Sequence, residues 1–164
     1  MASGQLRRLG RGLYAPANTE LSEHQSLVEI ATRVPKSVIC LLSALRFHEI
    51  GTQAPFEIWI ALSAGTHAPK LDTVRLRVIR LTGGAFSEGI ETHTVAGTPV
   101  RIYSAAKTIA DCFKFRNKIG LDVALEALKD AWQERKVTMD DLWRYAQINR
   151  VANVMRPYLE GLAA

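Results

Sequence analysis

Ser104 and Lys107 are spaced as in the S-x-x-K motif of β-lactamase-type acylases, in which the lysine activates the serine as a nucleophile. That chemistry also needs S-D-N and K-T-G elements, and the sequence contains neither. The same spacing suits the start of a helix, with Ser104 as its N-cap and Lys107 paired with Asp111 one turn later. We therefore predict a structural role for these residues.

A metal-dependent nuclease would need two or three carboxylates and a lysine gathered around one ion. The residues available for such a site are Glu57, Asp72 and Asp111, with Lys70 or Lys114. Asp72 and Lys70 fall in a predicted loop, and Asp111 already has a predicted partner. We expect no shared site from this set.

The cysteines and histidines show no metal-ligand spacing. Cys40 and Cys112 lie in apolar surroundings, and no C-x-x-C pair occurs. His48-Glu49 begins like the helix of a zinc protease, but Thr52 stands where the second histidine ligand belongs. We expect no metal, no cofactor and no catalytic residue, and thus a protein that is not an enzyme.

Basic residues gather in three groups that are candidates for binding nucleic acid, another polyanion or a partner protein. The groups are Arg7, Arg8 and Arg11 near the N-terminus, Arg75, Arg77 and Arg80 in a predicted strand, and Lys114, Arg116 and Lys118 in a predicted helix. The first group could contact phosphates or a minor groove, or it could be a solvated tail. The strand arginines could bind a polyanion, or they could pair with Glu57, Glu88 or Glu91.

Length and composition indicate an ordinary globular chain. It has 164 residues, 48% hydrophobic and 23% charged, with a formal net charge of +5. One domain with a small appendage fits this length. The longest apolar stretch, 38–45, is far shorter than a membrane span, and the sequence does not open with a basic and then apolar leader. We expect a cytoplasmic protein that has no contact with a membrane.

The pattern of elements predicts an α+β fold: a basic arm over 1–18, a helix pair, a small, mostly antiparallel sheet and a C-terminal helical bundle. The expected segments are helices over 22–34 and 36–49, strands over 57–62, 74–81, 90–95 and 100–103, and helices starting at 104, 122, 138 and 150. The alternation in 74–81 slips at Ile79. We expect a bulge there, which returns Arg80 to the face of Arg75 and Arg77; without it, Arg80 would point into the core.

Several segments together resemble the AbiEi-type antitoxin and transcriptional regulator family. Residues 8–14 (RLGRGLY) look like the end of the wing in a winged helix-turn-helix. The other similar segments are 24–27 (HQSL), 33–36 (RVPK), 39–45 (ICLLSAL), 104–113 (S-x-x-KTIADCF) and 150–159 (RVANVMRPYL). The likeness covers nearly the whole chain, with 19–164 as the antitoxin domain, and the combined segments are more specific than any one of them.

The resemblance implies a non-enzymatic antitoxin and regulator of a type IV toxin–antitoxin, or abortive infection, module. Such proteins repress their own operon through an N-terminal winged helix, and they counteract a nucleotidyltransferase-like toxin without a stable complex. Here the chain starts inside the wing, so we expect operator DNA binding, through Arg7, Arg8 and Arg11, to be weakened, lost or delegated.

Two other functions stay open at this stage. One is a metal-dependent nuclease or nucleotidyl enzyme whose carboxylates converge only in three dimensions. The other is an oligomerisation module of a larger DNA-bound assembly, and a homo-oligomer is compatible with the regulator as well.

Overall fold

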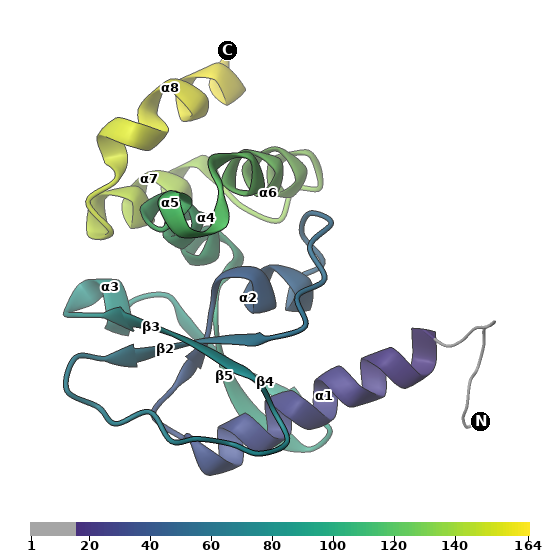
Figure 1. The fold of residues 1–164 in the computed structure, drawn as a ribbon. Helices are drawn as coiled ribbons and strands as arrows, with labels where there is room; N and C mark the ends of the chain where they lie inside the picture. Colours follow the sequence, from purple (N-terminus) through teal and green to yellow (C-terminus); the bar gives the residue numbers. More distant parts are fainter. Residues whose placement is uncertain (1–15) are drawn as a thin grey trace.

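A computed structural model describes residues 16–164, with side chains from residue 23 onward. Three layers make up this part of the chain (Figure 1). Helix α1 (Pro16–Arg33) covers one face of the central sheet, and α2 (Leu41–Phe47) with the C-terminal helices covers the other. The α+β class predicted from the sequence is confirmed. In the described residues, no helix is both long and apolar enough to cross a membrane.

The sheet has five strands in the order β3-β2-β1-β5-β4. Their bounds are β1 Val38–Ile39, β2 Ile58–Ser63, β3 Leu76–Leu81, β4 Ile90–Val95 and β5 Thr98–Tyr103. The β1–β2 and β4–β5 pairs are antiparallel, whereas β1–β5 and β2–β3 are parallel. The prediction of a mostly antiparallel sheet is therefore wrong: two of the four pairings are parallel. The long 64–75 connection lets β3 run parallel to β2, and the short strand β1, which lies in a predicted helix, pairs parallel with β5.

The remaining helices follow β3 and β5. Their bounds are α3 Gly84–Ser87, α4 Ala105–Lys114, α5 Arg116–Ile119, α6 Leu121–Gln133, α7 Met139–Ile148 and α8 Ala152–Ala163. Helix α4 packs against α2, α6 and α7, and α8 packs against α7. Helix α4 is thus the element through which the C-terminal helices are attached to the sheet.

Each face of the sheet has its own hydrophobic core. Leu27 and Ile30 of α1 pack with Ile39, Ile60 and strand residues that point the same way. On the other face, the side chains of α2, α4, α6, α7 and α8 form the larger core. Neighbouring residues of a strand point to opposite faces, so Val38 and Ile39 of β1 belong to different cores.

Two helix boundaries differ from the prediction. The segment predicted as one helix over 36–49 contains the short strand β1, and α2 begins only at Leu41. Val38 pairs with Ala61 and Ile39 with Ile102, so tertiary pairing overrides the helical pattern. Helix α1 begins at Pro16, before the predicted start, since proline suits a first helical turn. Residues 16–18 of the predicted arm are therefore helical.

The strands predicted over 90–95 and 100–103 form a tight hairpin. Strands β4 and β5 are joined by Ala96 and Gly97, which have φ angles of 50° and 82°. Positive φ at both turn residues matches the right-handed twist of the flanking strands. This hairpin forms the edge of the sheet opposite β3.

Candidate functional site

Lys107 and Asp111 form a buried ion pair inside α4. Their side chains are 0% exposed, and Lys107 Nζ lies 2.7 Å from Asp111 Oδ1. Asn149 Nδ2 donates to the same oxygen at 2.8 Å, and Lys107 Nζ sits 3.8 Å from the centre of the Tyr103 ring. Burial raises the pKa of Asp111, and the adjacent Lys107 ammonium opposes that shift. The pairing predicted from the sequence is confirmed, while Asn149 was not foreseen.

Ser104 has the capping role that the sequence predicts. Its Oγ accepts a hydrogen bond from the backbone N–H of Lys107 at 3.2 Å, and the Lys107 ammonium is held by Asp111 instead. The lysine is therefore not placed to take a proton from the serine hydroxyl. The S-x-x-K spacing here serves the helix start and its first i, i+4 pair.

The carboxylates that a nuclease site would need are not brought together. Glu57 pairs with Arg77 at 3.7 Å, and Asp72 lies in the 64–75 loop. Asp111, in α4, is buried and pairs with Lys107. In the part of the chain with described side chains, no group of three or more His, Cys, Asp or Glu residues could hold a metal ion. The specific constellation considered for metal-dependent chemistry does not form.

Both thiols are enclosed in the larger core. Cys40 precedes α2 and Cys112 lies in α4, and both are free and fully buried. Burial raises the pKa of each thiol above its ordinary value, so neither is a thiolate at neutral pH. They pack as small apolar residues.

A pair of arginines stacked on aromatic rings lies at the β3 edge of the sheet. The Arg77 guanidinium lies 4.9 Å from the centre of the Trp59 ring, and the Arg75 guanidinium lies 5.8 Å from that of Phe56. We call Phe56, Trp59, Arg75 and Arg77 the arginine–aromatic edge. Of its two cations, Arg77 also has a carboxylate partner, Glu57.

Arg80 does not belong to this row, so the predicted bulge is wrong. The register between β2 and β3 runs unbroken from Ile58–Leu76 to Ser63–Leu81. Strict alternation therefore places Arg80 on the opposite face from Arg77. Arg80 still avoids the core, because β3 is an edge strand and the exposed guanidinium reaches out to the carbonyls of Ser63 and Thr66.

The other two predicted basic groups are not part of this edge. Lys114 Nζ donates to the Asn149 carbonyl at 3.3 Å and Arg116 to the Phe113 carbonyl at 2.9 Å, while Lys118 is exposed. They lie at the end of α4 and in α5, within the C-terminal helical layer (Figure 1). Arg7, Arg8 and Arg11 lie outside the described residues.

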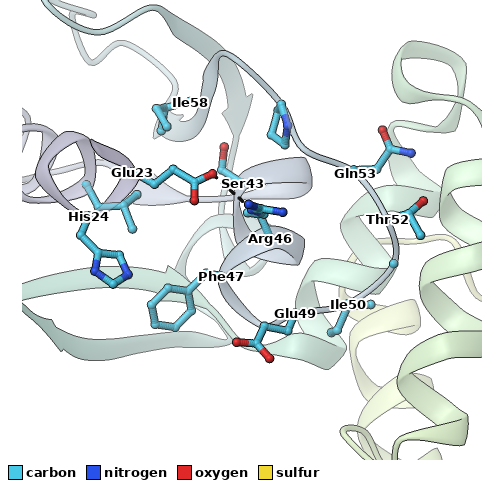
Figure 2. Close-up of a pocket in the computed structure, with 13 residues that line it drawn as sticks. Glu23, His24, Ser43, Arg46, Phe47, Glu49, Ile50, Thr52, Gln53 and Ile58 are labelled. Carbon is cyan, nitrogen blue, oxygen red and sulfur yellow. Dashed lines mark hydrogen bonds and ion pairs between the residues drawn. The ribbon is translucent and has the colours of Figure 1, made fainter. Parts of the chain in front are cut away.

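A cavity of about 610 Å³ opens between α1, α2 and the loop that leads to β2. Figure 2 shows Glu23 and Arg46 facing each other inside it, and Arg46 Nε lies 3.2 Å from Glu23 Oε2. Thr52 is held from α6 by Glu126, which fixes one wall. Sequence reasoning missed this cavity, since its walls come from segments that meet only in the fold. Glu23 and Arg46 pair with each other, and Glu49 is the other carboxylate in the lining, so like charges are not concentrated in this cavity.

His48 and His93 meet in a second cavity, of about 450 Å³, beside the start of α4. Their ring centres are 5.9 Å apart, and His48 Nε2 lies 2.8 Å from the Tyr103 carbonyl, to which it donates. His93 Nε2 lies 2.8 Å from Glu91 Oε1. Burial lowers the pKa of His48, and its bond to the Tyr103 carbonyl opposes the shift.

The lowered pKa of His48 predicts a loss of stability in mild acid. The folded state favours neutral His48, so this contribution is complete above the unfolded pKa of about 6.5 and is lost as the pH falls below it. We expect the free energy of unfolding to drop between pH 7 and pH 5.5, by less than about 1.4 kcal/mol per pH unit for this one group. Urea titrations at both pH values measure the drop.

His48→Gln should reduce that pH dependence, because a glutamine amide can still donate to the Tyr103 carbonyl but does not titrate. His67→Gln is the matched control, since His67 is an exposed loop residue. Equal pH dependence in the wild type and in His48→Gln would show that His48 is not the responsible group.

Comparison with known proteins adds no relative: no protein-family model matches the sequence, and no curated protein matches it significantly.

Proposed function

We propose that this chain is a non-enzymatic antitoxin and transcriptional regulator of a type IV toxin–antitoxin, or abortive infection, module. In this proposal it counteracts a nucleotidyltransferase-like toxin, and Arg7, Arg8 and Arg11 contact the DNA of its own operator. The proposal starts from the resemblance to AbiEi-type proteins carried by segments spread over nearly the whole sequence.

One observation carries the proposal: three of the resembling segments pack into one core. The three segments are 39–45, 104–113 and 150–159. They contribute Leu41 and Leu45, Ile109 and Phe113, and Leu159, in that order, to the larger core. The rings of Phe113 and Tyr158 lie 5.8 Å apart. These segments therefore belong to one folded unit, as an antitoxin domain over 19–164 requires.

The distribution of reactive side chains supports action by binding. Lys107, Asp111 and both cysteines are buried in structural roles. The charged groups that face solvent, such as Arg75 and Arg77, lie on surfaces where they can contact a partner. A binding scaffold needs this arrangement: a fixed interior and charge displayed outward.

Co-expression tests the proposal. The proposal expects a nucleotidyltransferase-like protein to be encoded beside this chain. That protein is induced alone and together with the chain, and colony formation is compared. The expected result is growth arrest by the toxin alone and restored growth when this chain is present. Size-exclusion chromatography of the two purified proteins should give separate peaks. Persistent arrest in cells that accumulate the folded chain would contradict the proposal.

A further inference from the structure

Phe56 is unusually exposed for a large apolar side chain. It is 81% exposed, whereas Leu121, the other exposed large hydrophobic residue in the described part of the chain, is 38% exposed. Phe56 lies in the loop just before β2 and has the Arg75 guanidinium over its ring. A phenyl ring that faces solvent beside a guanidinium is a surface on which a flat aromatic group can stack.

A groove adjoins this ring along the outer side of β3. It encloses about 670 Å³, within the size range of sites that hold small ligands. Leu76 and Val78 are among its apolar residues, and Phe56, Lys70, Asp72 and Arg75 also line it. Because β3 is the edge strand, alternate backbone N–H and C=O groups on its outer side have no strand partner and can bond to the edges of a base.

The charges at the groove favour an anionic occupant. Lys70 and Arg75 line the groove, are exposed and have no carboxylate partner within the described residues. Asp72 is the acidic residue that lines the groove. Among the charged residues that line the groove, the two cations, Lys70 and Arg75, outnumber the carboxylate of Asp72.

We propose that the β3 groove binds single-stranded nucleic acid, with a base stacked on Phe56 and neighbouring phosphates contacted by Lys70 and Arg75. An exposed ring flanked by cations is the arrangement that single-strand binding proteins use, and it accepts any base because every base has a flat face. A duplex keeps its bases stacked on one another and offers none to Phe56. This inference does not rest on the proposed antitoxin function.

Fluorescence anisotropy with the full chain tests the inference. The probes are labelled ten-nucleotide strands of deoxythymidine and of uridine, and a labelled ten-base-pair duplex. We expect at least one of the single strands to bind more tightly than the duplex. Comparison of the deoxythymidine strand with the uridine strand shows whether the groove prefers DNA or RNA. An excess of unlabelled polyglutamate peptide, which tests an acidic peptide as occupant, should not displace the strand.

Two variants should weaken binding to the single strand for different reasons. Phe56→Ala removes the stacking surface and should raise the dissociation constant about 10-fold or more. Arg75→Ala should also weaken binding and should reduce the slope of log affinity against log salt by about 1. Arg156→Ala is the matched control, because Arg156 also stacks on an aromatic ring, that of Trp143, 5.2 Å away in the C-terminal helices.

No binding to either strand would overturn the inference, as would equal affinity for strand and duplex. Equal losses in Arg75→Ala and Arg156→Ala would overturn it too, because they would assign the affinity to net charge alone. Thermal melting by circular dichroism checks that each variant is folded. If Phe56→Ala loses strand binding and still relieves the toxin, the groove and the antitoxin role are separate properties.

Discussion

Lys107→Met is expected to lower the free energy of unfolding by about 3–5 kcal/mol. The substitution leaves the carboxylate of Asp111 buried with only Asn149 as a partner, and an unpaired buried charge is costly. Asp111→Leu should have a similar effect, because it leaves the Lys107 ammonium enclosed against Tyr103 without its counter-ion. Urea unfolding followed by circular dichroism measures both.

The double variant Lys107→Met/Asp111→Leu should be more stable than either single variant. Replacing both charges removes the desolvation penalty of each, whereas removing one leaves the other uncompensated. Recovery should stop short of the wild type by about 1–3 kcal/mol, because Asn149 then loses the acceptor of its Nδ2 group.

An exposed ion pair supplies the control for this cycle. Arg144 and Glu88 lie 3.2 Å apart with both side chains about half exposed, so Arg144→Ala should cost less than about 1 kcal/mol. If the two single core variants cost no more than Arg144→Ala, the buried pair does not have the structural role described above.

Gly89→Ala is expected to destabilise the protein by about 3 kcal/mol or more. Gly89 has a φ of +83°, which an L-residue adopts only under strain. A Cβ at this position would lie 2.7 Å from Lys107 Cβ and 3.1 Å from Tyr145 Cε1. Lys107 Cβ is close to the backbone of α4 and cannot swing away, so α4 or β4 must shift.

Gly97→Ala separates the cost of backbone strain from the cost of the steric clash. Gly97 has nearly the same φ, +82°, but no heavy atom lies within 4 Å of its added Cβ. Its cost should be about 1 kcal/mol, from backbone strain alone. If Gly89→Ala and Gly97→Ala lose the same stability in thermal and urea unfolding, the close approach of Gly89 to α4 does not contribute to the cost.

Local sequence signals predicted the helical C-terminal part well. Thr138 accepts from the backbone N–H of Asp141, as its spacing indicates, and Ser104 caps α4 in the same way. Such caps depend on residues three apart in the sequence, so they can be predicted without knowledge of the fold. The pair Lys107 and Asp111 is local in the same sense.

Contacts between residues far apart in the sequence could not be predicted from the sequence pattern. Val38 and Ile39 sit in an apolar run that resembles a buried helix, and only β2 and β5 beside them make them a strand. Asn149 joins Asp111 across 38 positions, with no periodicity to link them. The exposure of Arg80 could not be predicted either. Its side chain stays out of the core because β3 lies at the edge of the sheet, and strand order is not visible in the sequence.

The candidate binding groove was only partly predictable. Arg75 and Arg77 were singled out as basic residues on one face of a strand, and the structure retains both at the arginine–aromatic edge. Phe56 was not, because an isolated phenylalanine before a strand usually belongs to a core. Its exposure becomes visible only when the loop that carries it is placed.

The growth rate of cells that express the nucleotidyltransferase-like toxin expected beside this chain is the most direct measure of the proposed antitoxin role. We expect the wild-type chain and Gly97→Ala to restore growth and Gly89→Ala, which disrupts the packing of α4, to restore it poorly or not at all. The purified chain alone should leave nucleotides unchanged with or without divalent cations. Arrest that persists beside abundant folded wild-type chain, or turnover of nucleotides by that chain, would contradict the account.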